Sequence, residues 1–361
     1  YTFLMALINY TQILMQIEQK GGIYLKISLM ILIIYNITSL LFLFMYAKTV
    51  ESLIWGNVVA NIIVFPFAYY NIRKKIQFVF SVDVLKNVMR YSLPMFFMVI
   101  FAWVLSMTDR LYIAKLVNLK EAGIYSLASK FMQAITLFAG AIYQAYGPYF
   151  YKTTSSYDYD TVSVKLKPVN ETITLMVCSI TIFVCLVSKN IISAFFTQEY
   201  SSCIIYIYIL SVSCVFTQQS GLLNLMIYQN KKTLGVCLIT VFCAVLSLSL
   251  NYFFIPCIGP LAAGFSNLIT GLCMFCMSLG LAKRNYYIPF GNKIIIYTVV
   301  IIMALFTLDD IIENVYVALL YKTIFLLLMI YIAIKVNIVS RELYPIVGRL
   351  GKKLISKLSI R

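Results

Sequence analysis

The chain has 361 residues, of which 62% are hydrophobic and only 12% are charged, against about 25% charged residues in a soluble globular domain. Lysine and arginine outnumber aspartate and glutamate by 29 to 13, and histidine is absent. This composition excludes a soluble protein, and no polar stretch is long enough to bury a core of its own. Because histidine is the usual general acid or base near neutral pH, its absence favours a function other than catalysis.

Apolar runs of about 20 residues, the length that a helix needs to cross a bilayer core, recur along the whole chain. They predict an all-α polytopic membrane bundle of about eleven transmembrane helices. The first run is already under way at Tyr1, so we expect it to be truncated. The predicted spans are 1–17, 23–46, 52–70, 92–115, 122–149, 169–188, 203–228, 233–255, 258–281, 293–308 and 315–336.

The predicted loops are short, and the two longest, 71–91 and 151–168, both carry several basic residues. Residues 71–91 are also amphipathic, which is typical of a helix on the inner leaflet, although a solvated connector fits equally well. Transporters are often built from two helix bundles, and this segment is a natural hinge between them. The predicted domains are the remainder of an N-terminal helical lobe (1–70), a basic cytoplasmic linker (71–91), a C-terminal six-helix lobe (92–281), and two extra helices with a basic tail (282–361).

Most of the 29 lysines and arginines fall in one set of alternate loops and in the C-terminal tail. By the positive-inside rule, this bias places the loops near Lys74, Lys152 and Lys231, and the tail, in the cytoplasm. The formal net charge of +16 is therefore interpreted as the result of many basic residues in the cytoplasmic loops and tail. No basic folded module indicates nucleic-acid binding.

The nine cysteines lie in or beside apolar runs, and Cys273 and Cys276 form a C-x-x-C inside one of them. Without histidine nearby, these cysteines are interpreted as small buried apolar residues rather than as a metal or redox site. No nucleotide-binding glycine loop and no nucleophile elbow occurs in the sequence.

One predicted helix, 122–149, carries polar residues on one face and large apolar residues on the other. Because a lysine in a spanning helix is costly unless it faces water or polar partners, this face is predicted to line a central cavity. Packing between helices through small residues is the alternative. The polar face holds Ser126, Ser129, Lys130, Gln133, Gly140, Gln144 and Gly147.

Asp109 and Arg110 lie near the end of the span 92–115, one tight turn before the helix that carries Lys130. A rise of about 1.5 Å per residue puts Asp109 and Lys130 at a similar depth on the two helices. The two could pair across this hairpin and leave Arg110 free for an anion. The alternative is that the charges mark the membrane interface.

A polar run from Thr217 to Gly221 interrupts the apolar pattern of the span 203–228. It contains Gln218 and Gln219, and Asn224 follows one turn later. Such a break indicates either a binding cavity or gate, or a polar packing contact.

Residues 90–149 resemble a stretch of the bacterial polysaccharide-export flippases, and the resemblance extends with lower specificity over the whole chain. There a basic linker leads to Ser-Leu-Pro, a span ends in Asp-Arg, and a short outer loop leads to Gly-x-Tyr-Ser-x-Ala-x-Lys. Residues 228–233 (YQNKKT) and 258–271 (IGPLAAGFSNLITG) are also similar to that family. The matching positions in the first stretch are Ser92, Leu93, Pro94, Asp109, Arg110, Gly123, Tyr125, Ser126, Ala128 and Lys130.

The resemblance implies the fold of the multidrug and oligosaccharidyl-lipid exporter superfamily, with two bundles of six helices, and makes the first visible span the fourth. It implies a transporter, not an enzyme: a flippase in the bacterial cytoplasmic membrane. This flippase would move an undecaprenyl-diphosphate-linked oligosaccharide, an O-antigen or capsule repeat unit, from the inner to the outer leaflet. Lys130, Arg110 and the glutamines are the candidates to replace the hydration of the diphosphate.

No bound cofactor is expected, and a proton or sodium gradient is the candidate driving force. The expected partners are the lipid-linked glycan and membrane lipids, with a polysaccharide polymerase and a chain-length regulator as further candidates. Two other functions remain open at this point: a cation-coupled multidrug exporter of the same fold, and an O-antigen polymerase. The exporter would favour acidic residues in the cavity, where Asp109 is the candidate.

Overall fold

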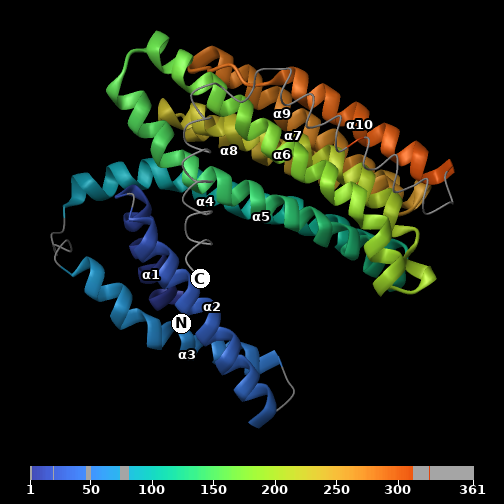
Figure 1. Ribbon diagram of the computed structural model, residues 1–361, viewed down its shortest axis with the longest axis horizontal. Helices are drawn as coiled ribbons and strands as arrows, with labels where there is room; N and C mark the ends of the chain where they lie inside the picture. The colour runs from blue at the N-terminus through green and yellow to red at the C-terminus, as the bar shows by residue number, and fades with distance from the viewer. Residues whose placement is uncertain (1, 19, 46–49, 74–80, 312–324, 326–361) are drawn as a thin grey trace, which may run out of the picture. The chain divides into compact units, whose positions relative to one another are not determined.

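The computed structural model of the chain describes residues 2–18, 20–45, 50–73, 81–311 and 325 (Figure 1). Within these residues it has ten α-helices, a short 3₁₀ helix and no strand, which confirms the all-α bundle. The helices follow the first ten predicted spans in order, whereas the eleventh (apart from residue 325) and the basic tail lie outside the described residues. They are α1 (Thr2–Ile17), α2 (Gly21–Met45), α3 (Val50–Ile72), α4 (Val82–Leu116), α5 (Leu119–Ser156), α6 (Tyr159–Phe195), η1 (Gln198–Tyr200), α7 (Cys203–Gln229), α8 (Thr233–Ile258), α9 (Leu261–Asn285) and α10 (Asn292–Ile311).

In the described part of the chain, seven helical segments are long and apolar enough to cross a membrane: α2, α3, α4, α6, α7 with η1, α8 and α9. Helices α1 and α10 are apolar but shorter. The predicted span in α5 is not among the seven, because its polar face lowers the hydropathy of the helix. Helix α5 can therefore lie in a membrane only if polar partners or water meet that face.

Two predicted loops are largely helical. Helix α4 begins at Val82, so the last residues of the linker 71–91 continue directly into the apolar part of α4, while 74–80 lie outside the described residues. The predicted loop 151–168 is wrong, because α5 runs to Ser156 and α6 begins at Tyr159. Lysine and threonine are compatible with a helix, so the polar composition of this segment did not end either helix.

The start of α6 is fixed by Asp158, whose side chain accepts hydrogen bonds from the Thr161 hydroxyl (2.7 Å) and from the Thr161 backbone N–H (3.5 Å). These bonds hold the pKa of Asp158 below its usual range, because they stabilise the charged carboxylate. An aspartate at the N-cap stabilises the first turn of a helix, so Asp158 explains why α6 begins before its apolar part.

The described helices group into two compact units. The first consists of Tyr1–Leu85 with Gln144–Tyr149, and the second of Lys86–Tyr143 with Phe150–Arg361. In the first unit, α2 packs along α3, and α1 packs against both. The core of this unit is formed by Ile8, Ile27, Val64 and Ala68.

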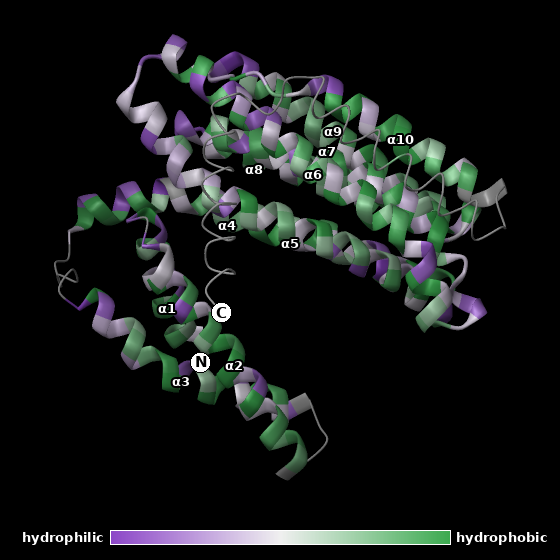
Figure 2. Ribbon diagram, viewed as in Figure 1, coloured by the Kyte–Doolittle hydropathy of each residue, from purple (hydrophilic) through white to green (hydrophobic). Residues whose placement is uncertain are grey.

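The second unit holds most of α4 and α5 and all of α6 to α10, and its most extensive contact is between α7 and α9. Helix α8 packs on α9, and α10 packs on α6 and α7. Figure 2 shows hydrophobic residues over the middle of these helices and hydrophilic residues gathered near their ends. A buried cluster in this unit joins six helices and includes Ile113, Tyr125, Ile192, Ile207, Ile255 and Ala263.

Small residues allow α7 and α9 to approach closely, as is usual for helices packed in a membrane. A Cβ atom added at Gly271 would lie 2.9 Å from the Ser213 hydroxyl oxygen and 3.1 Å from the Ser213 carbonyl oxygen. A Cβ at Gly264 would lie 3.3 Å from Ile209. The turn into α9 uses a third glycine, Gly259, at φ +73°, a left-handed conformation that glycine adopts without strain.

We predict that Gly271→Ala destabilises the second unit, because the methyl group meets backbone atoms of α7 that cannot move independently. The expected cost is about 1–3 kcal/mol, the range for overpacking a tight contact. Gly280→Ala in the same helix is the matched control, since a Cβ there meets nothing within 4 Å. Unfolding of the purified proteins in detergent measures both effects, and equal stability of the two variants would contradict the close approach.

Candidate functional site

A buried carboxylate lies at the centre of a polar cluster contributed by four helices of the second unit. Asp109 of α4 is only 5% exposed. Asn251 of α8 donates from Nδ2 to Asp109 Oδ1 (2.7 Å), and Tyr125 of α5 donates from its hydroxyl to Oδ2 (3.2 Å). Asn267 of α9 also donates from Nδ2 to Oδ2, and its Nδ2 lies 2.8 Å from the Tyr125 hydroxyl. We call Asp109, Tyr125, Asn251 and Asn267 the four-helix cluster.

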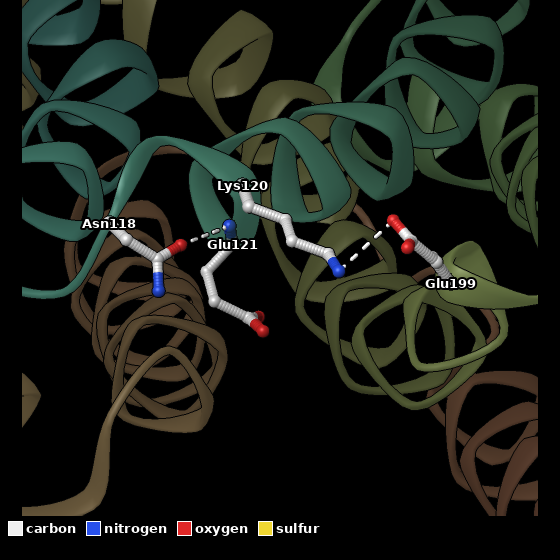
Figure 3. Close-up of polar contacts among 4 residues, drawn as sticks. All are labelled: Asn118, Lys120, Glu121 and Glu199. Carbon is white, nitrogen blue, oxygen red and sulfur yellow. Dashed lines mark hydrogen bonds and ion pairs between the residues drawn. The ribbon is translucent and has the colours of Figure 1, made fainter.

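The tight turn between α4 and α5 brings Asp109 and Tyr125 together. Asn118 caps α5, and its side-chain oxygen accepts from the Glu121 backbone N–H at 2.7 Å (Figure 3). The next residue but one, Lys120, forms an ion pair of 3.0 Å with Glu199 beyond the end of α6. That pair is more than half exposed and contributes little to stability, so the cap and the buried cluster fix this end of the hairpin.

The predicted pairing of Asp109 with Lys130 is wrong. The Lys130 ammonium donates instead to Gln133 Oε1 (3.3 Å), and both side chains are exposed on the second unit. Lys130 follows Tyr125, the residue that donates to Asp109, by five positions and therefore lies about 140° around α5 from it. In the described part of the chain, no lysine or arginine nitrogen lies within 4.0 Å of the Asp109 carboxylate.

The predicted polar face of α5 is divided between the two units. Ser126 and Ser129 are half-buried, and Ser129 donates to the Tyr125 carbonyl (3.0 Å). Gln144 is exposed within the first unit, where it accepts a hydrogen bond of 3.1 Å from the Tyr24 hydroxyl. That the whole face lines a cavity stays a prediction.

Arg110, the neighbour of Asp109, is half-buried and has no carboxylate within 4.0 Å among the described residues. Its Nε atom is buried without a hydrogen-bond partner, and its Nη1 atom lies 4.0 Å from the Met107 sulfur. A guanidinium with so few partners is compatible with the predicted anion contact, which stays a prediction.

The polar run from Thr217 to Gly221 does not break the helix, because α7 continues from Cys203 to Gln229. The polar side chains of this run form hydrogen bonds with neighbouring helices, and α7 stays helical around them. Gln218 donates to Thr136 of α5 (3.2 Å). Gln219, which is fully buried, accepts from Thr174 of α6 (3.1 Å).

A third contact of this kind links α7 to α9, where the Ser278 hydroxyl donates to Asn224 Oδ1 (3.4 Å). Together with the contacts of Gln218 and Gln219, it favours the packing interpretation of this polar run. In the described structure these residues connect α7 to three neighbouring helices.

Sequence reasoning missed three members of the four-helix cluster: Tyr125, Asn251 and Asn267. Tyr125 was visible only as part of the Gly-x-Tyr-Ser motif. Asn251 and Asn267 each stand in an apolar run, one on either side of the turn at Gly259. A single amide in a membrane helix usually has a partner, and that was the signal that could have identified them.

A structural metal or disulfide site is not found in the described part of the chain. No three residues among histidine, cysteine, aspartate and glutamate gather there in a way that could hold a metal ion. Cys273 is half-buried, Cys276 is exposed, and they form no disulfide. The interpretation of this pair as small buried residues is therefore wrong for Cys276, which is exposed.

Comparison with known proteins gives one match. The family model described as "Polysaccharide biosynthesis protein" matches residues 1–205, a region that contains Asp109, Arg110, Tyr125 and Lys130. No curated protein and no solved structure matches the chain. Because the matched region is more than half of the 361 residues, the chain belongs to the polysaccharide biosynthesis protein family.

Proposed function

We propose that the protein is a flippase that moves an undecaprenyl-diphosphate-linked oligosaccharide from the inner to the outer leaflet of the bacterial cytoplasmic membrane. Its family works in polysaccharide biosynthesis, and seven described helices are apolar enough to span a membrane. The observation that carries the proposal is the exposed Lys130–Gln133 pair on α5, a long helix too polar to lie against lipid alone.

The chemistry of the substrate fits this surface. A diphosphate cannot enter hydrocarbon without losing its hydration, so a translocation path must offer cations and hydrogen-bond donors in its place. Lys130 supplies an ammonium, Gln133 supplies an amide, and Arg110 supplies a guanidinium without a carboxylate partner in the described structure. The polyprenyl chain needs no such path, because it can stay in the bilayer.

The remaining parts of the proposal follow from the charge distribution and the family. The loops near Lys74, Lys152 and Lys231, and the C-terminal tail, face the cytoplasm in this arrangement. The protein acts as a transporter and not as an enzyme, driven by a proton or sodium gradient. A polymerase and a chain-length regulator use the delivered repeat units.

Deletion of the gene tests the proposal against both alternatives. We expect surface glycan to disappear and lipid-linked repeat units to accumulate where an impermeant glycosidase added to spheroplasts cannot reach them. Supplying the gene in trans should restore both. Loss of a polymerase would instead leave single repeat units on the surface, and loss of a multidrug exporter would leave the glycan intact and raise drug sensitivity.

A further inference from the structure

We propose that one end of the second unit binds the phosphate headgroup of an anionic phospholipid. The site is a basic and aromatic surface, which we call the basic platform, formed at the start of α6, the start of α8 and the end of α9. Its members are Tyr159, Lys232, Lys283, Arg284, Tyr286 and Tyr287. The inference does not depend on what the protein transports.

The base of the platform is the segment between α9 and α10, which is not helical but is anchored in the core. Ile288 is fully buried, and Phe290 is 4% exposed. The Ile288 N–H donates to the Met226 sulfur of α7 (3.5 Å). These anchors leave Tyr286 and Tyr287 half-buried at the surface, so the platform has a base fixed by packing.

Side-chain contacts join three helices at this end of the unit. The Tyr159 hydroxyl donates to the Tyr287 carbonyl (2.5 Å), and the Tyr159 ring meets the Tyr286 ring edge-on, with centroids 5.4 Å apart. The Lys232 ammonium donates to Asn285 Oδ1 (2.5 Å). The starts of α6 and α8 therefore lie beside the end of α9.

The cations of the platform are available to an anion. Lys232, Lys283 and Arg284 are exposed, and none has a carboxylate within 4.0 Å in the described part of the chain. Their recorded partners are neutral: Asn285 for Lys232, and the Tyr287 ring, whose centroid lies 5.9 Å from the Lys283 ammonium. Because an ammonium has three donor hydrogens, Lys232 keeps two of them for a further ligand.

The acidic residues at this end do not cancel the positive charge. Asp158 and Asp160 lie at the start of α6. Against them stand the three platform cations and two further exposed lysines at adjoining helix starts, Lys231 before α8 and Lys293 in α10. The excess of positive charge attracts anions to this end of the unit.

The position of the platform selects a lipid as the source of the anion. Helices α6, α8 and α9 are apolar enough to span a membrane, and the platform lies where they begin or end. Tyrosines at such positions lie at the level of the headgroups, and basic pockets between spanning helices bind anionic headgroups. Exposed apolar side chains begin within two turns, at Val164 and Leu234, where the acyl chains of a bound lipid would lie. A free phosphate would leave that apolar surface unused.

Native mass spectrometry of the purified full chain in detergent, titrated with phosphatidylglycerol, tests the proposal. We expect a saturable site that binds phosphatidylglycerol more tightly than phosphatidylcholine with the same acyl chains. Lys232→Gln combined with Lys283→Gln should weaken the binding of phosphatidylglycerol by about thirtyfold, because each basic residue near an anionic headgroup contributes about a factor of five. Binding of phosphatidylcholine should not change.

Lys115→Gln combined with Lys120→Gln is the matched control. These exposed lysines flank the turn between α4 and α5, and Lys120 pairs with Glu199 beyond the far end of α6. The control therefore removes the same formal charge from the opposite end of the second unit and should bind phosphatidylglycerol as the unaltered chain does. Equal losses in the two double variants would show that net charge, and not the platform, attracts the lipid, and would overturn the proposal.

Two soluble competitors identify the source of the anion. Glycerol 3-phosphate carries the phosphate without acyl chains, and polyglutamate stands for the surface of an acidic protein. We expect neither to displace phosphatidylglycerol at equal concentration. Displacement by glycerol 3-phosphate would make the platform a site for free phosphate, and displacement by polyglutamate would assign it to an acidic protein. Either result, or equal binding of the two phospholipids, would overturn the proposal.

Discussion

Replacing Lys130 by alanine should reduce glycan export strongly while the protein still inserts into the membrane. Lys130 is exposed, and its recorded partner is the neutral Gln133, so the ammonium is available to an anionic ligand. A hydrogen bond to a charged group contributes about 1.5–3 kcal/mol, so losing it would slow export by about ten- to a hundredfold. Surface glycan, measured against the amount of protein in the membrane, reports the effect.

Lys130→Arg should retain export, because arginine keeps the charge and can bind a phosphate through two N–H groups. Lys152→Ala is the matched control, since Lys152 is an exposed lysine near the other end of the same helix. Asp109→Asn should not rescue Lys130→Ala, because the two side chains do not touch. Normal glycan display by Lys130→Ala at normal protein levels would show that Lys130 plays no part in translocation.

In the described part of the chain the sequence was sufficient to predict which segments are helical, because the first ten predicted spans are all helices there. It failed where helices extend beyond their apolar part. Residues 151–168 are polar, yet the cap at Asp158 and the helix-compatible residues around it make them the end of α5 and the start of α6. Hydropathy measures how strongly a segment prefers lipid to water. It therefore cannot detect a polar extension of a helix beyond its apolar part.

The candidate site was harder to predict than the fold, because it depends on direction around a helix as well as on depth. Asp109 stood out in the sequence as a charge near the end of a span, but the partner chosen for it, Lys130, lies on another face of α5 and contacts Gln133 instead. Asn251 and Asn267 approach Asp109 only through the packing of α8 and α9, more than a hundred residues later in the chain. No spacing rule within one helix or one hairpin could have connected them.

The four-helix cluster predicts a further large effect, on stability. Asn251→Ala should lower the free energy of unfolding by about 1.5–3 kcal/mol, the value of a hydrogen bond to a charged group, because it removes a 2.7 Å bond to a buried carboxylate. Asn224→Ala is the matched control in the same unit. That asparagine is half-buried and accepts a longer bond of 3.4 Å from the neutral Ser278, so we expect a loss below about 1 kcal/mol.

A double-mutant cycle shows whether the effect comes from the charge of Asp109. In the Asp109→Asn background, position 109 carries no charge that depends on the Asn251 amide. The additional loss of unfolding free energy caused by Asn251→Ala should therefore be smaller than in the unaltered chain. Residues in one hydrogen-bond network are expected to couple by about 0.5–3 kcal/mol. Unfolding by SDS titration of the four purified proteins in detergent gives this coupling energy directly. A value near zero, with Asn251→Ala as harmless as Asn224→Ala, would mean that Asn251 does not stabilise the buried charge and that α8 is held to α4 by apolar packing alone.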